Sequence, residues 1–305
     1  MQTNGKPKAS VRGGVLRLLG AAGVAGVLTA GIALPAVGTV GMTAKSATEA
    51  LHLAPEELDE PPLPEKTVLL DADGKPFAQF YYQNRESVTL DKIAPIMRKA
   101  IVAIEDYRFY EHGPLDLEGT ARALIKNIVS GGVTQGGSSI TQQYVKQVLY
   151  NKAETEEEKA AAVAPTLSRK LTEIRYAMAI EQKYTKDEIL ERYLNIAYFG
   201  AGAYGIEAAA KRFFGKHASQ LNLAEAATLA GAVQNPNATD PNRGKRFRDR
   251  LLARRNVVLD RMAELKIITP EEAEKAKAQK LGYKDVPIPG GCEQSEFPYF
   301  CLYVR

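Results

Sequence analysis

The residues best suited to chemistry lie in two stretches of this chain. Glu105 directly follows an apolar run, Ile101–Ile104, so its carboxylate is expected to be partly desolvated. Desolvation raises the proton affinity of a carboxylate, which suits a general base. Downstream, Gly136–Gln143 carries small, hydroxyl and amide residues and no charge, and its loop-to-helix position suits anion binding. Together the stretches predict a base facing a polar floor for a sugar or phosphate.

The candidates for substrate binding in the second stretch are Ser139, Thr141, Gln142 and Gln143. Lys146 lies one helical turn after Gln142 and can reach back toward the same ligand. Each signal alone has a plain explanation, because a Gly-Gly-Ser-Ser sequence is typical of a flexible turn and a single lysine is usually solvated.

The plain alternative for Glu105 is a surface ion pair with Arg108 at the end of a helix. The neighbourhood favours a site instead, because charged and aromatic residues crowd the turn that follows Glu105. We interpret His112, at the end of that crowded turn, as a structural histidine.

Arg169, Lys170 and Glu173 form a third cluster. Their spacings of three and four residues place all three on one helical face. One interpretation is a surface salt bridge between Arg169 and Glu173, worth about 0.3–0.5 kcal/mol. The other is a cationic clamp on a diphosphate, with a second acidic group beside it.

Taken together, the clusters resemble the motifs of the glycosyltransferase domain of class A penicillin-binding proteins and of monofunctional peptidoglycan glycosyltransferases. The resemblance covers roughly residues 69–278. Its motifs are Glu105–Gly113, Gly136–Gln143 with Ser139 in a Thr position, Arg169–Glu173, Arg192–Ile206 and Glu225–Pro236. Each motif alone is weak evidence for this family, but five motifs in the right order are specific to it.

The resemblance implies a lysozyme-like helical fold and a defined reaction. Glu105 would deprotonate the 4-hydroxyl of the acceptor lipid II sugar. That oxygen would attack the anomeric carbon of the growing glycan strand and expel undecaprenyl diphosphate with inversion. Because diphosphate is a good leaving group, charge neutralisation matters more than proton donation.

The resemblance also implies roles for further residues. The cations available to the diphosphate are Arg108, Lys146, Arg169 and Lys170, and Asn195 of the fourth motif is a further binding candidate. Glu173 is the second catalytic candidate and a candidate ligand for a divalent cation, Mg²⁺ or Mn²⁺. No organic cofactor is expected.

Two other function classes stay open. A lysozyme-like muramidase that hydrolyses glycan strands also needs a glutamate, but it needs neither the Arg/Lys set nor a membrane anchor. A catalytically silent glycan-binding or scaffold protein would keep its function after Glu105→Gln.

The net charge of +4 is too small to imply a nucleic-acid partner.

The amino-terminal part of the chain predicts a membrane protein. Residues 1–17 are a basic tail without acidic residues, and residues 18–44 carry no charge, which is long enough to cross a bilayer. The basic tail predicts a cytoplasmic amino terminus, hence a single-pass signal anchor in the bacterial cytoplasmic membrane with the body on the outer face. A cleaved signal peptide ending near Ala44–Ala47 is the alternative.

The body is expected to be mainly α, with one small hairpin at residues 67–82 and a Pro- and Glu-rich spacer, 45–65, before it. The glycosyltransferase domain is placed at 66–282. The expected helices cover 93–104, 118–129, 140–149, 167–182, 186–197, 206–214, 223–233 and 246–265, with another starting at Thr269. The apolar 118–129 helix would dip into the membrane, and the acidic insert 154–164 is expected to be a mobile loop.

The carboxy-terminal segment 283–305 is non-helical by its pattern and is interpreted as a linker or the start of a missing transpeptidase domain. Cys292 and Cys301 lie here and are disulfide candidates outside the cytoplasm, with a free buried pair as the alternative. The expected partners are lipid II, the growing strand, the membrane, and other cell-wall synthesis and division proteins.

Overall fold

The computed structural model describes residues 60–116, 137–287 and 290–304. The predicted anchor at 18–44 and the predicted helix at 118–129 lie outside the described residues. Within these three ranges, no helix is both long enough and apolar enough to span a bilayer.

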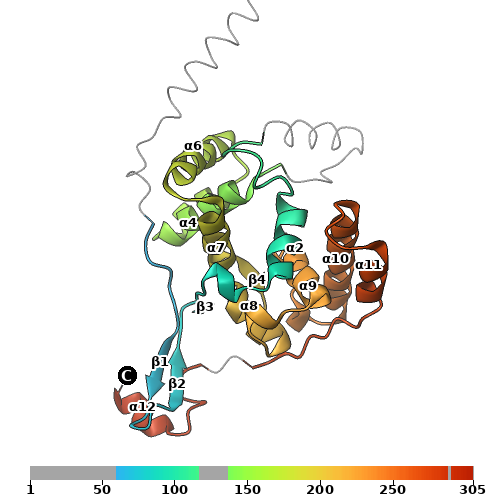
Figure 1. The fold of residues 1–305 in the computed structure, drawn as a ribbon. Coiled ribbons are helices and arrows are strands. Elements are labelled where there is room, and N and C mark those ends of the chain that lie inside the picture. Colours follow the sequence, from blue (N-terminus) through green and yellow to red (C-terminus); the bar gives the residue numbers. More distant parts are fainter. Residues whose placement is uncertain (1–59, 117–136, 288–289, 305) are drawn as a thin grey trace, which may run out of the picture. The chain divides into compact units, whose positions relative to one another are not determined.

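The described chain is mainly helical, as expected (Figure 1). Its helices are η2 (Leu90–Lys92), α2 (Pro95–Glu105), α4 (Ile140–Lys152), α5 (Glu156–Val163), α6 (Leu167–Lys183), α7 (Lys186–Ile196), α8 (Ile206–Phe214), η3 (Ala218–Gln220), α9 (Leu223–Ala232), η4 (Pro241–Arg243), α10 (Lys245–Glu264), α11 (Pro270–Lys277) and α12 (Pro298–Val304). Most of the longer helices begin and end within a few residues of the predicted bounds.

The strands form two small sheets. In the first, β1 (Thr67–Leu70) pairs antiparallel with β2 (Pro76–Phe80), which confirms the predicted hairpin. The second has the order β3-β5-β4, built from β3 (Asn84–Arg85), β5 (Ala203–Tyr204) and β4 (Tyr198–Gly200). The sequence did not predict this sheet, because strands of two or three residues are too short to show an alternating pattern.

Two groups of packed helices position the candidate site (Figure 1). In one, α9 packs against both α2 and α10, and in the other α4 packs against α6 and α7. Helix α2 buries Met97, Ala100 and Ile101, whose spacing lines one helical face. Helix α9 is rich in alanine, and a Cβ at Gly231 would lie 3.1 Å from the backbone of α10. Small residues therefore let α9 and α10 approach closely.

Two predictions about local structure were wrong. The insert predicted as a mobile loop contains α5, whose amino terminus has a capping box between Thr155 and Glu158. This pairing satisfies two backbone donors that a helix start leaves free. The carboxy-terminal segment predicted as non-helical contains α12, which begins at Pro298, and proline is well tolerated in the first turn of a helix.

The two cysteines are joined in a disulfide, with their Cα atoms 5.4 Å apart. Cys292, Cys301 and Ala78 form a small core of their own, on which Phe77 and Phe80 of the hairpin pack. An isolated bridge between Gln79 and Gly291 joins the same two segments. The disulfide thus ties α12 to Cys292, and the neighbouring Gly291 pairs with the hairpin.

Candidate active site

A cavity of about 930 Å³ lies between the two helical groups. It is lined from the end of α2, from α4, α6 and α7, and from α10. Of the predicted site residues, the structure brings Glu105, Ser139, Gln142, Gln143, Lys146, Arg169 and Glu173 together on its wall. Apart from Lys146, these come from the first three motifs, so segments separated by up to 68 residues in the chain meet at one surface.

Glu105 is the last residue of α2 and reaches the cavity wall. Its Oε2 accepts a 2.8 Å hydrogen bond from Nε2 of Gln143. Burial raises the pKa of Glu105, and this outweighs the hydrogen bond from Gln143 and the positive charges of Arg254 and Lys146. A carboxylate with a raised pKa and a neutral hydrogen-bond partner can take up a proton, as a general base must.

The amide of Gln143 is itself held in place. The hydroxyl of Tyr193 on α7 donates to Oε1 of Gln143 at 3.2 Å, so the amide nitrogen points at Glu105. Burial raises the pKa of Tyr193 well above its ordinary value, and the charge of Glu105 adds to this. The tyrosine therefore stays a hydrogen-bond donor over the working pH range.

Glu173 on α6 has a different setting. Its Oε1 pairs with Arg169 and its Oε2 lies 3.2 Å from Nζ of Lys170. The predicted salt bridge at a spacing of four residues is present, but the glutamate is 2% exposed, so it is not a surface pair. The cluster concentrates two cations around one buried carboxylate, which suits recognition of a diphosphate.

Lys170 also connects α6 to the second motif. Its Nζ donates 2.6 Å hydrogen bonds to Oγ of Ser138 and to Oε1 of Gln142. Burial lowers the pKa of Lys170, partly opposed by the charge of Glu173. Ser139 caps α4, since its Oγ accepts from the backbone N–H of Gln142 at 3.2 Å. Ser139 and Gln142, both predicted to bind substrate, therefore also hold this loop in shape.

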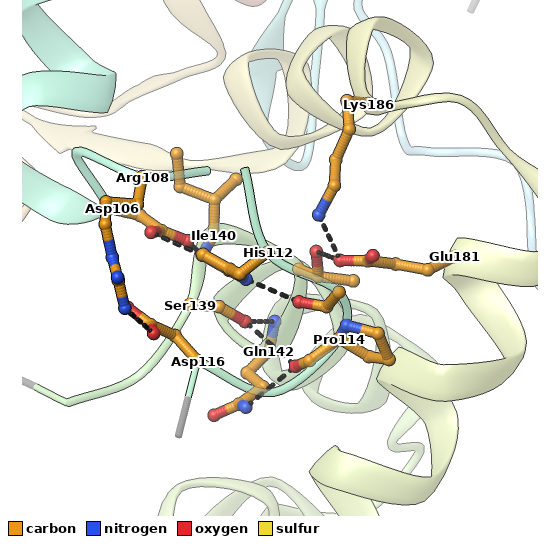
Figure 2. Close-up of polar contacts among 12 residues, drawn as sticks. Asp106, Arg108, His112, Pro114, Asp116, Ser139, Ile140, Gln142, Glu181 and Lys186 are labelled. Carbon is orange, nitrogen blue, oxygen red and sulfur yellow. Dashed lines mark hydrogen bonds and ion pairs between the residues drawn. The ribbon is translucent and has the colours of Figure 1, made fainter. Parts of the chain in front are cut away.

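The first motif folds back onto the start of α4 (Figure 2). Nε2 of His112 lies 2.7 Å from Oδ1 of Asp106, whose Oδ2 accepts from the backbone N–H of Ile140 at 3.1 Å. This is a structural role for His112, as interpreted from the sequence. Arg108 pairs with Asp116 rather than with Glu105, so the ion-pair alternative for Glu105 is wrong.

Two predicted binding residues face elsewhere. The hydroxyl of Thr141 donates to Glu181 at 2.6 Å, which ties α4 to α6. The amide of Asn195 is occupied by the backbone of Val88, with bonds of 2.8 and 3.0 Å, and Asn195 borders a second, smaller cavity. Both side chains are buried and hold the framework, so their predicted binding role is not supported.

Sequence reasoning missed Arg254 and Tyr193 as site residues. Arg254 on α10 lines the cavity, and the charge of Glu105 raises its pKa, although burial lowers that pKa more. The spacing of residues in the sequence could have identified Arg254. It recurs with Val257 and Arg261 on one helical face, and all three residues line the cavity. Tyr193 stands in the fourth motif two residues before Asn195, the residue that the resemblance predicted to bind substrate.

The comparison with known families decides the assignment. Residues 73–263 match the family model described as Transglycosylase, which is more than half of the chain. This chain belongs to the transglycosylase family. The resemblance to the glycosyltransferase domain of class A penicillin-binding proteins is thereby confirmed.

Similar proteins are longer than this transglycosylase chain. Penicillin-binding protein 1A of Escherichia coli is 40% identical over 73% of this chain and 26% of its own length. Penicillin-binding protein 1F of Bacillus subtilis is 35% identical over 77% of this chain and 30% of its own length. A crystal structure of penicillin-binding protein 1A from Haemophilus influenzae is 23% identical, with a TM-score of 0.40, over 73% of this chain and 21% of that one. The chain thus spans under a third of each.

Proposed function

We propose that this transglycosylase polymerises lipid II into the glycan strands of peptidoglycan. Glu105 takes the proton of the acceptor 4-hydroxyl, and the oxygen forms a bond to the anomeric carbon of the growing strand. The bond from that carbon to undecaprenyl diphosphate breaks with inversion, and the diphosphate leaves with the electron pair. The observation that carries this proposal is Glu105, a carboxylate of raised pKa on the wall of a large cavity beside a cationic cluster.

The cationic cluster supports the second half of the reaction. Arg169 and Lys146 line the cavity, and Lys170 lies behind them on Ser138 and Gln142. Cations already in position stabilise charge that develops on a leaving group without reorganising. We assign neutralisation of the diphosphate to these residues.

The residues present do not fit a resident metal at Glu173. Each of its carboxylate oxygens is already paired with a cation, so Mg²⁺ or Mn²⁺ would have to displace Arg169 or Lys170. Asp106, His112 and Asp116 bring three potential ligand atoms within 4.8 Å. These atoms are engaged in the His112–Asp106 contact and, at Asp116, with Arg108. We therefore assign no step to a metal ion.

We further propose that the domain works on the outer face of the bacterial cytoplasmic membrane, held by a single signal anchor at residues 18–44. The long uncharged run in the sequence and the lipid-linked substrate support this location. Its partners would be lipid II, the growing strand and other cell-wall synthesis and division proteins.

The test is incubation of the purified full chain with labelled lipid II. Polymer from the wild type and none from Glu105→Gln is the expected result, and moenomycin should block polymerisation. Release of fragments from finished peptidoglycan, with no polymer from lipid II, would show a muramidase instead. An inactive wild type whose glycan binding survives Glu105→Gln would identify a scaffold protein.

A further inference from the structure

A proline-rich segment before the first strand lies against the helices of the candidate site. Residues 60–64 read Glu-Pro-Pro-Leu-Pro, and proline fixes φ and removes a backbone donor, so this segment is stiff. Leu63 packs against the main core, and the carbonyl of Pro64 accepts a 2.7 Å hydrogen bond from the buried Arg85. We call residues 60–64 the strap.

Glu60 is the residue through which the strap holds the helices. Its carboxylate accepts hydrogen bonds from the Tyr184 hydroxyl at 2.7 Å, from Lys183 at 3.0 Å, and from the Tyr144 hydroxyl. The guanidinium of Arg192 lies 3.6 Å away. Burial acts to raise the pKa of Glu60, but these hydrogen bonds outweigh burial and lower it. The carboxylate therefore stays ionised at neutral pH and keeps all four partners.

Two of the four partners of Glu60 come from the helices that carry Gln143 and Tyr193, while Lys183 ends α6 and Tyr184 follows it. Tyr144 is next to Gln143 on α4, and Arg192 is next to Tyr193 on α7. Tyr193 donates to Gln143, which in turn donates to the candidate base. Glu60 thus joins α4 to α7 one residue away from the contact that orients the Gln143 amide.

We propose that Glu60 is a positioning residue for glycosyl transfer, which clamps α4 to α7 and so keeps the amide of Gln143 on Glu105. This inference rests on the proposed function. Glu60 borders the smaller cavity of about 330 Å³, while Gln143 and Glu105 line the larger one. The effect is therefore transmitted through the two helices and not through contact with the substrate.

If Glu60 positions Gln143, loss of Glu60 should change the pH dependence of catalysis, which a purely structural role would leave unchanged. The hydrogen bond from Gln143 lowers the pKa of Glu105, so withdrawal of the amide raises that pKa further. A base must be ionised to act, so the acidic limb of kcat/KM should move to higher pH. A hydrogen bond to a charged group is strong enough to shift a pKa by about one unit, and partial loss should give a shift of about 0.5 unit.

The experiment measures polymerisation of lipid II against pH, together with thermal unfolding, for the full chain and its variants. Glu60→Ala is expected to move the acidic limb upward by about 0.5 unit. Glu60→Gln keeps an acceptor oxygen for the Tyr144 hydroxyl and should move it less. Tyr144→Phe, which removes the hydroxyl alone, should reproduce the shift.

Glu86→Gln is the matched control. Glu86 also bonds two cations, Lys66 and Lys211, at 2.7 Å each, but neither lies on α4 or α7. This variant should lower Tm without moving the acidic limb.

The outcomes separate the two proposals. If Glu60→Ala and Tyr144→Phe lower Tm but leave the limb at its wild-type pH, Glu60 is merely structural and the positioning role is overturned. Should Glu60→Ala fail to fold, an unmoved limb in Tyr144→Phe overturns it equally. If the wild type makes no polymer from lipid II, the proposed function itself fails, and the positioning role falls with it.

Discussion

Glu105 and Glu173 line the same cavity in opposite electrostatic settings. Glu105 is bonded by the neutral amide of Gln143, and burial raises its pKa. Glu173 is 2% exposed, and each of its oxygens faces a cation. Proton exchange suits the first setting, and the organisation of positive charge suits the second. The comparison shows that the partners of a carboxylate, as well as its burial, decide which chemistry it suits.

The largest expected effect tests Glu105 as the base. Glu105→Gln keeps the shape of the side chain but removes the proton acceptor, and polymerisation should fall about 10³-fold, within the range for general base catalysis. The rate of strand formation from labelled lipid II measures this. Glu111→Gln is the matched control, because Glu111 is an exposed glutamate of the same motif, and it should stay near the wild-type rate. Equal losses in both variants would contradict the assignment.

The next effect tests the cationic half of the comparison. Arg169→Met removes a charge from the cluster around Glu173 while keeping much of its length, and kcat should fall about 10²-fold, as for other charge-stabilising donors. Steady-state polymerisation kinetics measure kcat and KM separately. A loss confined to KM would mean that Arg169 binds the ground state and the transition state equally.

Replacing each of the two glutamates by glutamine should change Tm in opposite directions. The folded-state pKa of Glu105 is raised, so its contribution to stability is lost as the pH rises from the unfolded value of 4.5 through the folded value. At neutral pH, Glu105→Gln should therefore raise Tm. Glu173→Gln should lower it by several degrees, because two cations lose their buried partner. Thermal unfolding at pH 7.5 and at pH 4 checks both, and the gain from Glu105→Gln should vanish at the lower pH.

The pH dependence of the wild type gives a smaller but direct test. Because burial raises the pKa of Glu105, the acidic limb of kcat/KM should lie above 4.5, the ordinary glutamate value. Activity should be lost as the pH falls through that limb. A limb at or below 4.5 would rule out Glu105 as the titrating base.

The smallest effect on catalysis is expected at Thr141. Its hydroxyl is bonded to Glu181, so Thr141→Val should cost about 1–3 kcal/mol of stability and change the rate per folded molecule less than about 2-fold. Denaturant unfolding and the lipid II assay measure the two quantities on one preparation. A large loss of rate without a loss of stability would restore Thr141 as a binding residue.

The pattern of apolar residues in the sequence was sufficient to predict most of the helices, because apolar residues recur every three or four positions in α2, α7 and α8. It was insufficient for the β3-β5-β4 sheet, whose members are too short to show a period. Helix α5 was missed although the Thr155–Glu158 capping box was readable in the sequence. Its alanine- and glutamate-rich composition also favours a helix, so the loop prediction was wrong.

The sequence by itself determined the order of the motifs and predicted Glu105 as the candidate base, because residue types and spacing need no partner to be read. Only the tertiary structure decided which side chains face the cavity. Thr141 and Gln142 are neighbours on one helix, yet one bonds Glu181 and the other lines the site. The direction of each side chain depends on which helix packs beside it, and so do the opposite surroundings of Glu105 and Glu173.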